Sequence, residues 1–138
     1  KGLEAEELLA IYGALDSNPH FQARHTQSTI HVAMAELSAE LRDLSGMMQH
    51  YDLAFAAKRH AVYPYRQATY LVSAGLYEDA LAYLDKADRA LTLQTRLYLP
   101  DLAPRIADLR AAIMHHLESQ QSRHNDNNTA LDHPARQK

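Results

Sequence analysis

Histidines and paired carboxylates are the side chains in this sequence that could bind a metal ion or perform acid–base chemistry. There are nine histidines, but their spacing matches no metal motif. His115 and His116 are neighbours, so on a helix they point about 100° apart. No Glu-x-x-His or His-Glu-x-x-His motif occurs. We therefore interpret the histidines as solvated or hydrogen-bonded side chains and predict neither a metal site nor a cofactor.

The two carboxylate pairs are Glu6-Glu7 and Glu78-Asp79. The first pair lies near the start of an expected helix, where negative charge is favourable, so both pairs have a structural interpretation. The sequence contains no glycine-rich phosphate loop and no nucleophile elbow, and it has no cysteine. We therefore predict no catalytic residues and expect the protein not to be an enzyme.

Length and charge exclude further classes of function. The chain has 138 residues and a net charge of −3, and its basic residues are scattered, which argues against nucleic-acid binding. No apolar run reaches the roughly 20 residues that cross a bilayer, so we expect no membrane insertion within this segment. The chain begins at Lys1 and not at methionine. We expect a piece of a longer bacterial protein, cytoplasmic or periplasmic, in which a membrane anchor would lie outside this segment.

Apolar residues recur at helical spacing along most of the chain. In the clearest stripe, Ile30, Met34, Leu37, Leu41 and Leu44 follow one another at steps of 4, 3, 4 and 3. The patterns predict six helices, which cover about 3–15, a start between 20 and 28 up to 45, 47–60, 64–75, 77–99 and 101–119. No segment alternates with the period of a strand.

The predicted fold is all-α, with about six antiparallel helices forming stacked helical hairpins. We expect a helical domain at 1–119 and a polar C-terminal tail at 120–138, because the apolar pattern stops after Ser119. Gly46 is expected to end the second helix in the left-handed conformation that glycine adopts readily. Aligning Gly46 with Gly75 brings Phe55 onto Leu84, which indicates an internal repeat of 29 residues.

Segment 68–87 carries the strongest repeat signature. It combines small residues at helix contacts, large apolar residues between them, and a turn with glycine, tyrosine and two acids. Its signature positions are Ala68, Leu71, Gly75, Tyr77, Ala80, Leu84 and Ala87. The segment resembles a tetratricopeptide repeat. Three positions depart from that family's pattern, namely Pro64, Gln67 and Thr92, and the 29-residue spacing is shorter than the family's repeat of about 34.

The resemblance implies a scaffold that binds other proteins. In tetratricopeptide proteins the first helix of each hairpin lines a concave groove that holds a peptide or a partner helix. The groove positions here would be Val62, Tyr65, Thr69, Val72 and Ser73, and we add Arg66 because arginine is a common interface anchor. The partner would be a protein or peptide, or a second copy associating through an uncovered end of the stack.

Two alternatives remain open at this stage. The segment could be a helical appendage that only positions other parts of a larger assembly. It could also be a cofactor-binding bundle of a larger enzyme. The second alternative requires two histidines to meet within ligand distance, and the candidates are His31, His50, His60 and His115.

Overall fold

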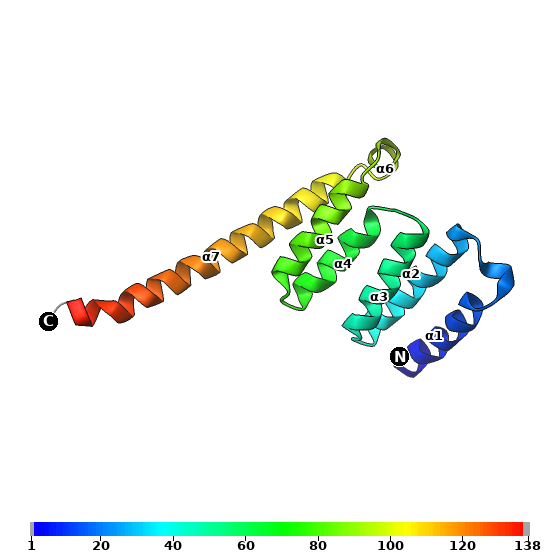
Figure 1. Ribbon diagram of the computed structural model, residues 1–138, viewed down its shortest axis with the longest axis horizontal. Helices are drawn as coiled ribbons and strands as arrows, with labels where there is room; N and C mark the ends of the chain where they lie inside the picture. Colours follow the sequence, from blue (N-terminus) through cyan, green and yellow to red (C-terminus); the bar gives the residue numbers. More distant parts are fainter. Residues whose placement is uncertain (1, 137–138) are drawn as a thin grey trace.

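The computed structural model describes residues 2–136, with side chains from 4 to 127, and it contains helices and no strand within that range. The helices are α1 (Gly2–Asp16), α2 (Arg24–Glu40), α3 (Leu44–Ala57), α4 (Val62–Ser73), α5 (Tyr77–Ala90), α6 (Leu93–Tyr98) and α7 (Leu102–Arg136). A 3-10 turn, η1 (Pro19–Phe21), follows α1. Figure 1 shows α1 to α5 and the first part of α7 lying side by side. The all-α prediction is confirmed over the described residues.

Three helical segments begin at a polar side chain that binds a free backbone N–H. Asn18 accepts a hydrogen bond from His20 at the start of η1, Asp43 from Gly46 at the start of α3, and Thr92 from Thr95 at the start of α6. Such caps satisfy amides that have no carbonyl partner in the first turn. They fix where each helix begins.

The predicted role of Gly46 is wrong. The second helix ends at Glu40, and the left-handed residue in the following turn is Arg42, with φ 60°. Gly46 lies in the first turn of α3, where its N–H donates to Asp43 Oδ1 at 2.9 Å. The local N-cap of Asp43 outweighs the tendency of glycine to end a helix.

The position of Arg42 changes the internal repeat from 29 to 33 residues. Gly75, with φ 79°, is the other left-handed residue within 2–136, and it lies 33 positions after Arg42. The helix ends obey the same spacing, since α2 and α4 end at Glu40 and Ser73. The corresponding buried pairs are Ala35 and Ala68, Met47 and Ala80, Tyr51 and Leu84, and Ala54 and Ala87.

We expect Arg42→Gly to stabilise the protein by up to about 1 kcal/mol, because glycine adopts a positive φ without the steric cost of a side chain. The reverse change, Gly75→Ala, should destabilise it by about 1 kcal/mol or more. Urea unfolding followed by circular dichroism measures both free energies. A loss of stability in Arg42→Gly would contradict the assignment of strain to this turn.

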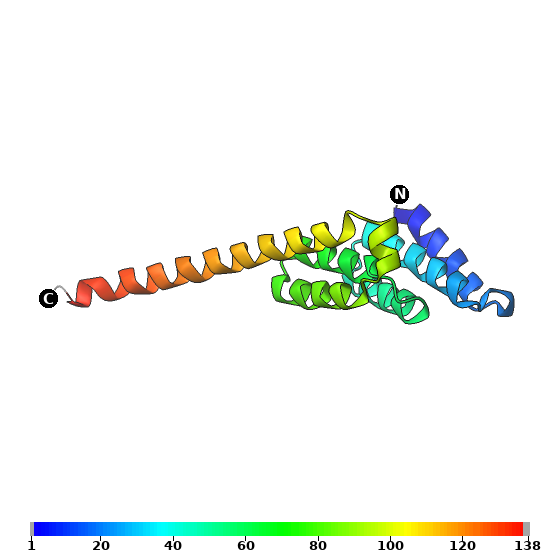
Figure 2. The same ribbon diagram turned by 90° about the horizontal axis from the view of Figure 1, so that it is seen from above.

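Two boundaries differ from the sequence prediction. The expected helix 77–99 is divided into α5 and α6, because Leu91 and Thr92 are extended and Thr92 caps the next helix. The last helix does not end near 119 but continues through the polar segment to Arg136. The side chains of 120–127 are exposed, and this part of α7 projects beyond the other helices (Figure 2). Residues 137 and 138 of the predicted tail lie outside the described range.

The core lies between helices that follow one another along the chain. The helix α2 packs on α1 and α3, α4 packs on α3 and α5, and α7 packs on α5 and α4. The larger apolar cluster joins α3, α4, α5 and α7 around the fully buried Leu84 and Ile106. Gln67 is also fully buried, and its Nε2 donates to Asp52 Oδ1 at 2.9 Å and to the Met48 carbonyl at 3.2 Å. These bonds tie α4 to α3, and Lys86 of α5 pairs with the same carboxylate at 3.6 Å.

Candidate functional site

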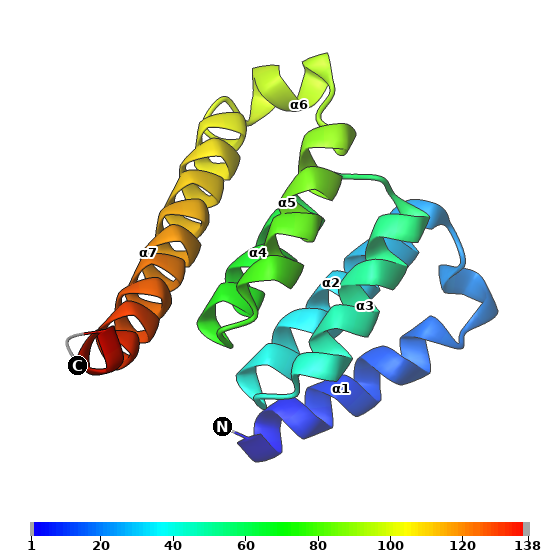
Figure 3. The same ribbon diagram turned by 60° about the vertical axis from the view of Figure 1, so that its left-hand side comes forward.

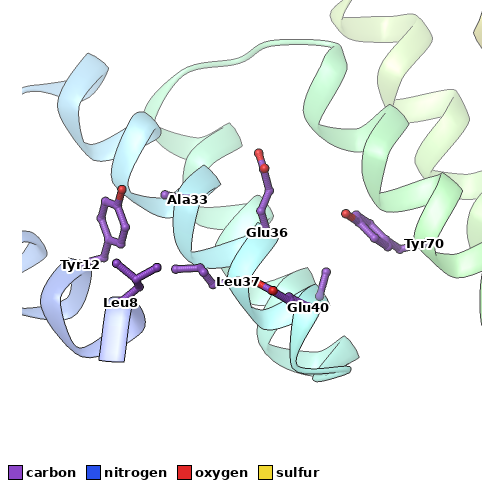
Figure 4. A pocket seen from close by; sticks show the side chains of 8 residues that line it. Leu8, Tyr12, Ala33, Glu36, Leu37, Glu40 and Tyr70 are labelled. Carbon is purple, nitrogen blue, oxygen red and sulfur yellow. The ribbon is translucent and has the colours of Figure 1, made fainter. Parts of the chain in front are cut away.

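A groove opens between α1, α2 and α4. Figure 4 shows Leu8 and Tyr12 of α1 on one side, Glu36 and Glu40 on α2, and Tyr70 of α4 on the other side. Ala33, Leu37 and Ala39 complete its lining. The space has a volume of about 540 Å³ and is open to solvent. Its apolar floor with polar edges is suited to holding a side chain or a short segment of another protein.

A second cleft lies between α4 and the connection from α6 to α7. Its volume is about 420 Å³. The lining combines aromatic, apolar and cationic side chains, which are Val62, Tyr65, Arg66, Tyr98, Leu99, Pro100, Asp101, Leu102 and Arg105. Such a mixture is typical of surfaces that bind proteins, where tyrosine and arginine supply most of the binding energy.

One ion pair connects the groove with this cleft. Arg66 of α4 donates to Glu36 Oε1 of α2 at 3.1 Å, and each residue lines one of the two spaces. Both side chains are about half exposed, so the pair contributes little to stability. Its consequence is geometric, because it places the two spaces next to each other. We call the combined surface the concave groove.

Below the concave groove lies Tyr51 of α3, which is fully buried. Burial raises the pKa of Tyr51 to about 12, although the positive charge of the nearby Arg66 acts in the opposite direction. The phenol therefore stays neutral at physiological pH and is not poised to act as a base. Its hydroxyl oxygen has no hydrogen-bond partner among the described residues.

The structure brings together three of the six predicted groove residues. Val62, Tyr65 and Arg66 line the same cleft. Thr69 and Ser73 direct their hydroxyl groups to carbonyls of their own helix, at 2.7 and 3.2 Å, and Ser73 also lines a small hollow beside Tyr70. Val72 packs against the apolar core.

The predicted signature residues of segment 68–87 lie where α4 and α5 meet. Most of them are buried, namely Ala68, Leu71, Ala80, Leu84 and Ala87. Gly75 occupies the left-handed turn between the two helices. The half-buried Tyr77 lies with its ring centroid 4.4 Å from that of His116 on α7. The signature thus marks the packing of α4, α5 and α7.

Sequence reasoning missed the α2 half of the groove. The 33-residue spacing relates Ala33, Glu36, Leu37 and Glu40 to four residues of α4, which are Arg66, Thr69, Tyr70 and Ser73. The same face of each helix is therefore used twice. The missed signal was the register, because the 29-residue alignment paired Ala68 with Ala39 and not with Ala35.

Two histidines that are distant in sequence meet inside the protein. His31 Nδ1 of α2 and His50 Nδ1 of α3 are 3.2 Å apart, and their rings stack with centroids 5.4 Å apart. His31 is 6% exposed, and its Nε2 lies 3.3 Å from Asp16 Oδ1 of α1. The chain Asp16–His31–His50 therefore links three helices by hydrogen bonds.

The histidine pair has the geometry of a hydrogen bond, in which one Nδ1 donates and the other accepts. Among the described residues, no three side chains of the metal-binding types are placed to hold one ion. Burial lowers the pKa of His50, and the neighbouring His31 adds to this effect, while Asp16 and Asp43 oppose it. The arrangement joins helices and presents no open position for a substrate.

Comparisons with protein-family models, with curated proteins and with solved structures find no match for this chain. No helix within the part that the structure describes has the length and apolar character needed to span a bilayer.

Proposed function

We propose that this protein is a non-catalytic interaction scaffold built from tetratricopeptide-like hairpins, and that it binds a segment of another protein in the concave groove. The observation that carries the proposal is the repetition of the groove. Lining residues of α2 and α4 correspond at 33 residues, close to the repeat of about 34 in the tetratricopeptide family. Helices α2 and α4 would be the first helices of two stacked hairpins.

The chemistry of the groove supports a protein partner. Tyr12, Tyr65 and Tyr70 supply flat apolar surfaces with a hydroxyl group, and such residues are enriched at interfaces. Glu40 and Arg105 add opposite charges at the two ends of the groove. A peptide with a basic residue toward α1 and an acidic residue toward α7 would match this distribution.

Site-specific photo-crosslinking in cells tests the proposal. A photoreactive amino acid at position 40, on the groove edge, should give a covalent adduct with a defined protein. The same amino acid at position 53 should not, because Leu53 lies on α3 and lines none of the groove. Adding Tyr65→Ala and Thr69→Ala to the crosslinking variant should remove the adduct.

The melting temperature of each variant controls for folding. If the double substitution lowers it strongly, Thr69→Arg replaces it as the test, since a long side chain at this half-exposed position would fill the groove. Equal adducts at positions 40 and 53, or an adduct that survives these substitutions in folded protein, would exclude the groove as the binding site.

A further inference from the structure

Helix α6 carries the most exposed apolar surface of the described chain. Leu93, Leu97 and Tyr98 are 75%, 70% and 76% exposed, and no residue of α6 is buried. Leu93 and Leu97 are one helical turn apart and therefore lie on the same side. A contiguous apolar patch rimmed by polar groups is a mark of an interaction site. Figure 3 shows α6 at the edge of the molecule, where it crosses from α5 to α7.

The surroundings of α6 are positively charged. Lys58 and Arg59 line a hollow together with Tyr98, and Arg105 lines the cleft on the other side of the same tyrosine. Arg96 belongs to α6 itself. Asp101 is the only carboxylate in the linings of these two spaces. The partner of this surface should therefore be apolar and acidic.

The chain contains a helix with that composition. Glu4, Glu7, Ile11 and Ala14 of α1 follow one another at steps of 3, 4 and 3, so they share one face, and all four are exposed. Ile11 is 55% exposed although it is a large apolar residue. The opposite face packs on α2 and contains the buried Ala5. The outer face of α1 is therefore an acidic and apolar surface without a covering element.

We propose that α6 of one copy binds the outer face of α1 of a second copy. Leu93 and Leu97 would pack against Ile11 and the small Ala14, while the cations beside α6 face the glutamates. Figures 1 and 3 place α1 and α6 apart, so one chain cannot form this contact with itself. The surface borders the concave groove at Tyr98 but uses different side chains. The inference therefore goes beyond the proposed function and does not depend on it.

The contact joins two different surfaces and is head-to-tail. Such a contact gives a closed ring when the rotation between copies closes, a symmetric dimer when each copy offers both surfaces to the other, and a filament otherwise. Added salt should weaken the association because the charges are exposed and screened.

Sedimentation velocity of the purified chain over a wide concentration range is the first measurement. The wild type should associate with increasing concentration, and Leu93→Ser with Leu97→Ser should weaken association about tenfold or more. The matched control is Leu53→Ser, which changes a leucine that is 41% exposed on α3 and should leave association unchanged. Both variants should keep wild-type helicity, since the altered side chains are exposed.

Charge reversal gives the decisive test. Glu4→Lys with Glu7→Lys should abolish self-association, and so should Lys58→Glu with Arg96→Glu in a second protein. Mixing the two reversed proteins should restore association, because each acidic face then meets a basic one. A wild type that stays monomeric at every concentration would overturn the proposal and leave α6 to a different acidic protein. So would association that survives both reversals, or reversed proteins that stay apart when mixed.

Discussion

Replacing Ala35 by leucine is expected to destabilise the protein by about 1–3 kcal/mol, the usual cost of overpacking a filled core. Ala35 is fully buried where α2 meets α3, next to Met47 and Tyr51. The extra carbon atoms of leucine would have to displace one of these side chains or move the helices apart. Small residues at such contacts allow helices to approach closely, so an enlargement there disturbs the packing of the whole hairpin.

The 33-residue register makes this prediction specific. Ala68 occupies the same place between α4 and α5, so Ala68→Leu should cost a similar amount. The 29-residue alignment instead makes Ala39 the counterpart of Ala68. Ala39 is only half-buried and borders the solvent-open groove, so Ala39→Leu should cost less than about 1 kcal/mol.

Urea unfolding of the three variants, followed by circular dichroism, compares these free energies directly. The control is the wild-type helicity of each folded variant before urea is added. A larger loss for Ala39→Leu than for Ala35→Leu would show that the register is not 33 residues.

Local sequence signals were sufficient for the helices and insufficient for their register. The apolar period located each helix, because one buried face follows directly from residue spacing. The turn after α2 was misplaced because glycine is the usual left-handed residue and here an arginine adopts that conformation. An Asp at the N-cap position three residues before Gly46 was the available signal for the correct boundary.

The site was predicted in part for a related reason. Val62, Tyr65 and Arg66 came from the resemblance around segment 68–87, which covers α4. The remaining walls come from α1, α2 and the start of α7, which approach α4 only in the folded chain. The contact of His31 with His50 spans 19 positions and follows no helical period, so spacing alone could not reveal it.

The continuation of α7 past residue 119 has a different origin. Segment 120–127 has no apolar face, so burial does not drive its folding, and its side chains are exposed. A helix already formed by the packed Ile106 and Ile113 can extend at low cost, because each added residue gains one hydrogen bond without a new nucleation step. Apolar periodicity reports the packed part of a helix and not its extension.

Stability should fall as the pH decreases from about 8 to 5.5. Burial lowers the pKa of His50 below its usual 6.5, and His31 adds to the effect. Burial and the charge of Lys58 lower the pKa of His60 in the same direction. Below pH 6.5 the unfolded chain therefore binds more protons than the folded chain, which favours unfolding. The full stability is present above pH 6.5 and is lost toward the folded-state pKa values.

The loss has an upper limit of about 1.4 kcal/mol per pH unit for each histidine, because each binds at most one extra proton on unfolding. The structural reason is clear at both sites. When His31 and His50 are both protonated, neither Nδ1 can accept the hydrogen bond between them, and two positive rings face each other at 3.2 Å. At His60, Nδ1 accepts from the Val62 N–H at 3.1 Å, and protonation would remove that acceptor.

Urea unfolding at several pH values from 5.5 to 8 measures this dependence while avoiding the titration of most carboxylates. His50→Gln should reduce the slope of the unfolding free energy against pH, and His50→Gln with His60→Gln should flatten it further. The matched control is His25→Gln at an exposed histidine of α2, which should keep the wild-type slope. An unchanged slope in the double variant would mean that other groups cause the acid sensitivity. A reduced slope in the first variant would show that the junction of α1, α2 and α3 is held by a histidine pair that must keep one nitrogen free of a proton.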